Sequence, residues 1–289
     1  MYEKFYGLNS KPFNLTPDSE FFFASPKHEE ALNRLLLTIS ERNGFTVITG
    51  EIGSGKTTVC RTLLSKLDPI TKVTLILNTH LTKREFLTSI LDDLGIEYKS
   101  NSKTHLLSAL NKFLIEQASQ DINVVLIVDE AQNLTPSVLE EVRMLSNLET
   151  EKDKLIQIIL VGQPELRAKL MQPKLEQFSQ RIVLYYHLAA LDFAETEGYI
   201  KFRLKKAGNE SRDIFSPEAI LEIFKYSNGI PRLINLACHN ALISGLVYEA
   251  SFITVEIARE SIQELMHHAG FSSMKRATEK LLQASKYSV

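Results

Sequence analysis

The feature that most constrains the fold is a glycine-rich octapeptide in the first fifth of the chain. The segment from Gly50 to Thr57 reads Gly-Glu-Ile-Gly-Ser-Gly-Lys-Thr and fits the pattern G-x-x-x-x-G-K-S/T of a phosphate-binding P-loop. A short β-rich run from Phe45 to Thr49 precedes it, and residues 58–67 have the pattern of a helix. This order of strand, loop and helix is the context in which the motif functions. We therefore expect an α/β unit built around this loop.

The residue types in the loop suit a polyphosphate. Glycines let the backbone approach the anion with its N–H groups pointing inward, and the following helix presents its positive N-terminal end. Lys56 is expected at the β and γ phosphates, and the Thr57 hydroxyl at Mg²⁺. The alternative is a Gly/Ser turn followed by a surface lysine. The predicted nucleotide-binding residues are Gly50, Glu51, Ile52, Gly53, Ser54, Gly55, Lys56, Thr57 and Thr58.

A pair of carboxylates further along the chain predicts hydrolysis. The unbroken apolar run Val124–Val128 is typical of a strand buried on both faces of a parallel sheet, and it ends in Asp129-Glu130. Asp129 is expected to help hold Mg²⁺, and Glu130 to act as the general base on an attacking water. The alternative is a surface Asp-Glu pair at the start of a loop. Combined with the P-loop, the pair predicts an ATPase with ATP and Mg²⁺ as its cofactors.

Strands and helices alternate through the first two thirds of the sequence. This pattern predicts a parallel α/β sheet with helices on both faces. Helix starts are marked by Ser25-Pro26, by the capping box Thr82-Lys83-Arg84-Glu85 and by Thr135-Pro136. The other expected strands cover 73–77, 156–161 and 182–185, and the other expected helices cover 27–42, 83–94, 104–117 and 135–148.

From about residue 188 the pattern is purely helical, with helices expected at 193–207, 217–226, 231–247 and 255–267. This region reads as a small all-helical lid domain. We therefore expect four parts. They are an aromatic N-terminal arm (1–24) packed on this domain or on a neighbouring subunit, a P-loop α/β domain (25–187), the helical lid domain (188–268) and a polar tail (269–289).

Composition narrows the class of protein. The formal net charge of −2 gives no global field that would favour nucleic acid, so such contact would need a local basic patch. No apolar run approaches the length of a membrane-spanning helix, and the N-terminus has no signal-peptide core. Both cysteines, Cys60 and Cys238, are expected to be reduced and structural. We expect a cytoplasmic protein, with any peripheral position at the inner membrane reached through a partner.

Four further segments have a distinctive sequence. They are the opening Met1–Asp18 with its Phe5-Tyr6-Gly7-Leu8 and Lys11-Pro12-Phe13, then Leu139–Thr150, Val161–Leu166, and Tyr186-His187-Leu188 followed by Leu191. A P-loop α/β domain followed by a helical lid resembles an AAA+ ATPase, and these four segments resemble the ExeA/GspA-type secretion ATPases in particular. The resemblance covers about residues 1–268. Larger members continue into a membrane helix and a peptidoglycan-binding domain. This sequence looks more like the short, soluble members of pilus biogenesis, such as those of mannose-sensitive pili.

The resemblance implies roles for four further residues. Gln163 matches the sensor-1 position at the γ-phosphate or the water, and Asn78 matches a polar switch that restrains the catalytic glutamate. Arg232, in Gly229-Ile230-Pro231-Arg232, resembles sensor 2 of the lid. Arg181 resembles an arginine finger that reaches a neighbouring subunit's ATP. The alternative for Gln163 is a polar residue that ends a strand, and the alternative for Arg181 is a surface arginine. For Asn78 and Arg232 the alternative is that they have no such role.

Two basic features receive a structural interpretation. Arg143 lies in a segment shared with the family, and an ion pair with Glu140 on the same helix is expected. The segment Lys201–Lys206 is basic, and a solvated helix face is favoured over a nucleic-acid patch. The seven histidines show no metal-ligand spacing with the cysteines.

The family resemblance implies an ATPase that self-associates into a ring or another ATP-dependent oligomer. It would drive assembly of an envelope secretion or type IV-like pilus system with a membrane-anchored partner. A DNA-binding AAA+ ATPase that regulates transposition is the alternative. A nucleotide-gated scaffold with little turnover is a third, against which the intact Asp129-Glu130 argues.

Overall fold

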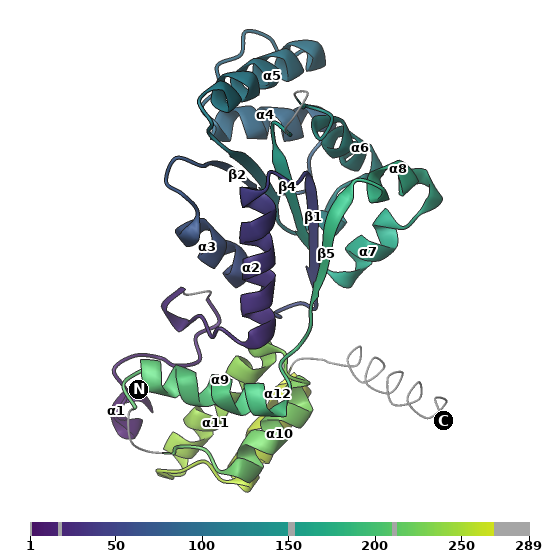
Figure 1. Ribbon diagram of the computed structural model, residues 1–289. Helices are drawn as coiled ribbons and strands as arrows, with labels where there is room; N and C mark the ends of the chain where they lie inside the picture. Colours follow the sequence, from purple (N-terminus) through teal and green to yellow (C-terminus); the bar gives the residue numbers. More distant parts are fainter. Residues whose placement is uncertain (1, 17–18, 150–153, 210–212, 269–289) are drawn as a thin grey trace. The chain divides into compact units, whose positions relative to one another are not determined.

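The computed structural model describes residues 2–16, 19–149, 154–209 and 213–268, and the chain divides into two units (Figure 1). One unit covers Pro17–Ala190 and contains the sheet. The other combines Met1–Thr16 with Leu191–Val289, and the elements of its described residues are helices. Residues 1–24, expected to form one arm, are thus divided between the units. The expected tail at 269–289 lies outside the described residues.

Five parallel strands form one sheet in the order β2-β3-β4-β1-β5. The strands are β1 Phe45–Gly50, β2 Lys72–Ile76, β3 Val124–Val128, β4 Gln157–Gly162 and β5 Ile182–Leu188. Every residue of β1, β3 and β4 is buried, as their apolar composition predicts for strands covered on both faces. The carboxyl ends of β1, β3 and β4 therefore meet at one edge, beside one another.

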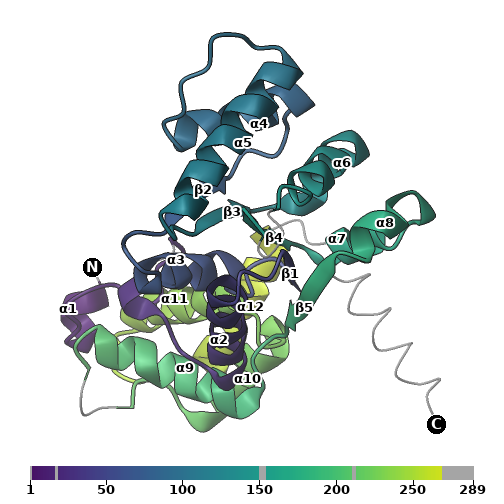
Figure 2. The ribbon, with the colours of Figure 1, turned by 45° about the horizontal axis from the view of Figure 1, so that its top comes forward.

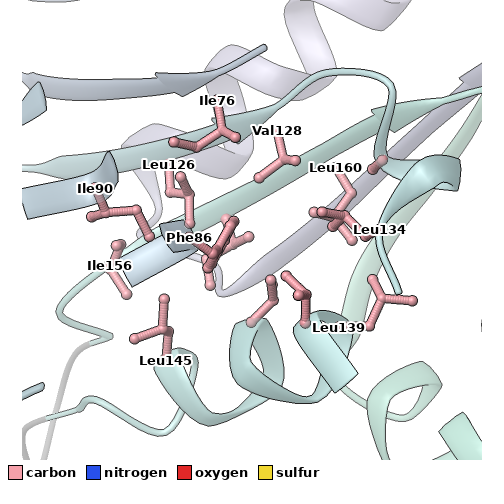
Figure 3. Close-up of a cluster of buried hydrophobic side chains, with 14 of the residues drawn as sticks. Ile76, Phe86, Ile90, Leu126, Val128, Leu134, Leu139, Leu145, Ile156 and Leu160 are labelled. Carbon is pink, nitrogen blue, oxygen red and sulfur yellow. The ribbon is translucent and has the colours of Figure 1, made fainter. Parts of the chain in front are cut away.

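Helices cover both faces of the sheet, as predicted. On one face, Val125 and Ile127 of β3 pack against apolar side chains of α2 (Pro26–Ser40) and α3 (Lys56–Lys66). On the other face, Leu126 and Val128 belong to a larger cluster (Figure 3). The helices that contribute to that cluster are α4 Lys83–Asp93, α5 Lys103–Ser119, α6 Pro136–Leu145, α7 Pro164–Leu170 and α8 Glu176–Ser179. Short 3-10 turns lie at η1 Ser19–Phe21, η2 Ala131–Asn133 and η3 Pro173–Leu175.

The starts of α2, α4 and α6 follow the caps predicted at Ser25, Thr82 and Thr135. The Ser25 side chain caps α2, and Thr82 and Glu85 form the expected capping box at α4. Helix α4 lies beside α5 (Figure 2). α6 ends at Leu145, three residues earlier than expected. The N–H groups of Asn147 and Leu148 bond to carbonyls three residues back, in tight turns, and not four residues back as in an α-helix. β5 continues to Leu188 rather than ending at 185, because β1 pairs with it as far as Gly50.

The helical unit contains α9 Phe193–Lys206, α10 Pro217–Ser227, α11 Pro231–Val247 and α12 Val255–His268, close to the predicted bounds. Helices α10, α11 and α12 pack on one another. The N-terminal helix α1 (Tyr2–Tyr6) packs on α11, with Tyr2 Oη 3.1 Å from His239 Nδ1, and Tyr6 Oη donates to Ala250 O at 3.0 Å. Tyr2 and Tyr6 are therefore part of this unit's core.

Arg203 corrects the interpretation of the basic segment in α9. The segment was expected to spread its charges over a solvated face, and Lys201, Lys205 and Lys206 are exposed. Arg203 is instead buried, where it donates to Pro12 O and, at 2.8 Å, to Tyr199 Oη. The expectation failed for this residue because it lies on the helix face that the N-terminal segment covers.

Within the described ranges, no helix combines the length and the apolar composition needed to cross a membrane.

Candidate functional site

The P-loop connects the end of β1 to the start of α3, with Lys56 as the first residue of the helix. The Lys56 side chain is buried, and its Nζ donates to Gly50 O at 2.8 Å and to Glu51 O at 2.9 Å. Burial lowers the pKa of Lys56, and the charges of Glu130 and Asp129 act in the opposite direction. The ammonium is thus held inside its own loop, beside two carboxylates. Its N–H donors now bond to loop carbonyls, and a phosphate oxygen can take the place of those carbonyls as acceptor.

Two glycines of the loop could not carry a side chain without strain. Gly55 has φ of 101°, in the left-handed region that other residues avoid. A Cβ at Gly50 would stand 2.7 Å from Leu188 O and 2.8 Å from Ser54 Oγ. Ser54 Oγ is buried, and nothing in the described part of the chain hydrogen-bonds to it. A bare backbone concavity with an unsatisfied hydroxyl beside a lysine fits a bound anion.

Thr57 and Asp129 bring the two sequence motifs together. Thr57 Oγ1 donates to Asp129 Oδ2 at 2.9 Å, and the other oxygen, Asp129 Oδ1, accepts the backbone N–H of Glu130 at 2.8 Å. Asp129 is buried at the carboxyl end of β3. A hydroxyl and a carboxylate are oxygen ligands of the kind that Mg²⁺ prefers. This pair therefore fits a magnesium ion beside the P-loop.

Glu130 adopts a left-handed backbone conformation, with φ of 52°, which costs a non-glycine residue about 1 kcal/mol. Its Oε2 accepts hydrogen bonds from Gln132 Nε2 at 2.5 Å and from Gln163 Nε2 at 3.2 Å. Gln132 Oε1 in turn accepts the backbone N–H of Gln163 at 3.0 Å. Two amides thus orient the carboxylate, and one of them belongs to Gln163, whose expected sensor-1 role stays a prediction.

Gln132 and Lys169 are site residues that the sequence did not reveal. The 3-10 turn η2 carries Gln132 back toward Glu130, and a Cβ on Gly162 would stand 2.8 Å from Gln132 Oε1. Lys169 Nζ donates to Gln132 O and, at 2.9 Å, to Leu134 O. Burial lowers the pKa of Lys169. The proximity of Gln132 to Asp129-Glu130 in sequence is the one signal that could have indicated it.

Two further predicted residues lie on other elements. Asn78 follows β2, is exposed, and its Oδ1 accepts the His80 N–H at 3.2 Å. Arg232 lies in the first turn of α11 in the helical unit. Their expected roles stay predictions.

Arg181 immediately precedes β5, so it lies at the amino ends of the parallel strands, whereas the P-loop lies at their carboxyl ends. Its Nη1 donates to Ser146 Oγ at 3.3 Å. Arg181, Arg143 and Ser146 line an open cavity of about 1000 Å³. Arg143 makes the expected intrahelical pair, with Nη2 2.6 Å from Glu140 Oε1. Arg143 and Arg181 thus line a cavity at the end of the sheet away from the chain's own P-loop.

Within the described segments, no three His, Cys, Asp or Glu side chains cluster as metal ligands. Cys60 and Cys238 are both buried and free.

Comparison with known proteins identifies relatives of this chain. A family model described as "AAA domain" matches residues 39–170. General secretion pathway protein A of Aeromonas hydrophila is 42% identical over 245 residues, which are 84% of this chain and 45% of that protein. The chain thus spans less than half the length of this curated relative. The resemblance expected from the sequence is confirmed.

Solved structures share the fold. The Aeropyrum pernix ORC2 protein has a TM-score of 0.64 at 18% identity, covering 89% of this chain and 72% of that one. Cdc6p from Pyrobaculum aerophilum has a TM-score of 0.64 at 20% identity, covering 86% and 71%. The RuvB Holliday junction branch migration motor of Thermotoga maritima has a TM-score of 0.57 at 19% identity, covering 84% and 70%. At these identities the likeness concerns the fold alone, and it confirms the predicted P-loop α/β class.

Proposed function

The chain belongs to the ExeA/GspA-type AAA proteins, and we propose that it binds ATP with Mg²⁺ and hydrolyses it to ADP and phosphate. The observation that carries the proposal is the 2.9 Å hydrogen bond between Thr57 Oγ1 and Asp129 Oδ2. It joins the phosphate-binding loop to the strand end that carries Glu130. A phosphate site and a restrained carboxylate at one sheet edge are the parts that phosphoryl transfer to water requires.

In the proposed reaction, the backbone N–H groups of residues 53–57 and the Lys56 ammonium hold the β and γ phosphates. Thr57 and Asp129 hold Mg²⁺, which neutralises charge on the phosphate oxygens when it is bound. Glu130 accepts a proton from the water that attacks the γ-phosphate in line. Gln132 and Gln163 keep the Glu130 carboxylate oriented, which their hydrogen bonds support. Positioning and charge neutralisation supply most of the rate.

Three further residues act beyond this cluster in the proposal. Arg232 contacts the γ-phosphate from the helical unit as sensor 2, and Asn78 restrains Glu130 between turnovers. Arg181 completes the site of an adjacent subunit, so the active form is an oligomer. The position of Arg181 beside an open cavity, at the sheet edge away from its own P-loop, supports action in trans.

The biological role that we propose is assembly of an envelope secretion or type IV-like pilus system. The name of the Aeromonas hydrophila relative supports secretion. ATP hydrolysis would be coupled to a membrane-anchored partner, and the protein would act in the cytoplasm at the inner-membrane surface. A role in transposition on DNA is less favoured, because Arg203 is buried and Lys201 pairs with Glu197 at 2.7 Å. Steeply salt-dependent DNA binding in the presence of ATP would reverse that preference.

The test compares ATP turnover by the wild-type protein with that of Glu130→Gln. Wild-type turnover should require Mg²⁺. The variant should bind ATP normally and lose about 10²–10⁴-fold in kcat, because an amide cannot take the proton from water. Glu116→Gln, an exposed substitution on α5, is the matched control. Turnover within a few-fold of wild type in Glu130→Gln would mean that the base lies elsewhere, and absence of ATP binding by wild type would overturn the function itself.

A further inference from the structure

A buried histidine on α2 lies directly behind the P-loop. His28 is 5% exposed and comes from the first turn of the helix. Its Nε2 lies 3.0 Å from the backbone oxygen of Ser54, and its Nδ1 lies 2.7 Å from Ser25 Oγ. Ser25 is the N-cap of α2 and also accepts the His28 backbone N–H. The imidazole is thus held between its own helix cap and the centre of the phosphate-binding loop.

The chemistry of the two partners determines the direction of the ring hydrogen bond. A carbonyl oxygen can only accept, so Nε2 must carry the proton and donate to Ser54 O. The Ser54–Gly55 peptide bond is trans, so the Gly55 N–H points opposite to the Ser54 carbonyl. Since the carbonyl points toward His28, the Gly55 N–H points away from it, to the other side of the loop. The histidine therefore fixes the orientation of one of the N–H groups expected at the phosphates.

Gly55 and His28 are also complementary in shape. A Cβ at Gly55 would lie 2.7 Å from His28 Nε2, closer than real side chains approach. The imidazole therefore takes the space that a side chain at position 55 would need. Any rotation of the Ser54–Gly55 peptide would have to displace a ring that is held at both nitrogens.

The turn of α2 that carries His28 is anchored to β5. Tyr186 Oη donates to Lys27 O at 2.9 Å, and Lys27 Nζ donates to Ala190 O at 2.9 Å. Phe22 packs edge-on against the imidazole, with ring centroids 6.1 Å apart. Contacts from two neighbouring segments thus hold the ring in place before any nucleotide arrives.

We propose that His28 is a positioning residue for nucleotide binding. It holds the Ser54–Gly55 peptide in the orientation that presents the Gly55 N–H to a phosphate oxygen of the nucleotide, and so pre-organises the P-loop. This inference rests on the proposed ATP binding and adds a residue that contacts no ligand atom. Because the N–H binds phosphate in the ground state and in the transition state alike, the effect falls on affinity and KM rather than on kcat.

The test uses the different reach of two amide side chains. Glutamine can place its N–H₂ near the position of Nε2, whereas asparagine reaches only the position of Nδ1. His28→Asn and His28→Ala should weaken ATP binding about tenfold and raise KM by the same factor, with kcat within about twofold. His28→Gln should recover affinity to within about threefold. His105→Asn, on the exposed side of α5, is the matched control. Affinity is measured by calorimetry, and thermal melting without nucleotide confirms folding.

The outcomes separate this inference from the proposed function. If wild type binds ATP and His28→Asn binds equally well, or if His28→Gln is as weak as His28→Ala, the positioning role is wrong while the function stands. If wild type itself fails to bind ATP, both are wrong. If the variants do not fold, a measurement on the wild-type protein still tests the inference. Nitrogen-15 chemical shifts should report the Nε2–H tautomer for His28, and a ring with a bare Nε2 would contradict the inference.

Discussion

Gln132 donates a hydrogen bond from Nε2 to Glu130 Oε2 at 2.5 Å, and its Oε1 accepts the N–H of Gln163 at 3.0 Å. One amide therefore connects the end of β3 to the residue that follows β4. Glu130 holds a left-handed backbone conformation at this point, with φ of 52°. The orientation of the carboxylate thus depends on a residue that contributes no charge of its own.

Gln132→Ala should lower kcat about 10- to 100-fold and leave ATP affinity within about threefold, because a misplaced base slows the chemical step without removing phosphate contacts. Steady-state kinetics and calorimetry on the same preparation measure the two effects. Gln120→Ala, at the exposed end of α5, serves as the control. A variant with unchanged kcat would show that Gln163 alone suffices to orient Glu130.

Lys56→Ala should abolish detectable ATP binding, since it removes the ammonium that the loop holds beside its own carbonyls. The expected loss is roughly 2–4 kcal/mol of phosphate interaction. Calorimetry with ATP and Mg²⁺ measures it. Lys66→Ala, on the exposed last turn of the same helix, should bind like wild type. Wild-type affinity in Lys56→Ala would remove the basis for the phosphate site.

Arg181→Ala should lose hydrolysis while its own P-loop still binds ATP. Mixed with Lys56→Ala, it should regain activity, because a mixed interface combines an intact P-loop with an intact arginine. Arginine fingers contribute about 10³–10⁵ in rate, so modest complementation should exceed background. Size-exclusion chromatography with ATP must first show that the two variants form a shared oligomer.

If mixed oligomers form and activity stays at background, Arg181 has a structural role through Ser146, and another arginine must be sought. Arg143 lines the same cavity but is paired with Glu140. Arg167 lies over the Tyr185 ring, 5.1 Å from its centroid.

Cys60 should be nearly inert in the folded protein. Burial on α3, together with the charge of Asp129, raises the pKa of its thiol from 9.0 to about 12. At pH 8 the thiolate fraction falls from about one tenth in the unfolded chain to about 10⁻⁴ in the fold, so labelling should be about a thousandfold slower. A chromogenic thiol reagent on the Cys238→Ala variant, with and without urea, measures the difference.

The same shift has a consequence for stability. Because folding raises the thiol pKa, its stabilising contribution is complete below pH 9.0 and is lost as the pH rises toward about 12. The free energy of unfolding should therefore fall less steeply over that range in Cys60→Ala than in wild type. Equal slopes, or rapid labelling of the folded protein, would place Cys60 in a solvent-accessible position.

Local sequence patterns predicted most of the fold. The run Val124–Val128, the P-loop and the caps at Ser25, Thr82 and Thr135 each depend on neighbouring residues only. Buried strands read as apolar runs, and helix starts expose N–H groups that a nearby side chain can satisfy. The ends of elements were less predictable. The end of β5 is set by its pairing with β1, which continues to Leu188, whereas its own composition suggested an end at residue 185.

The sequence by itself determined that a glycine-rich loop of the P-loop pattern and a pair of carboxylates exist, since each motif lies within a few consecutive residues. Only the tertiary structure decided what supports them. Gln132 meets Glu130 because η2 turns the chain back, and His28 meets Ser54 because α2 packs beside α3. Arg203 is buried because the segment around Pro12 lies against it. Hydrogen bonds of this kind join segments far apart in sequence, or joined by a turn of irregular geometry. Their partners are fixed by the packing of the sheet and its helices, which no local pattern records.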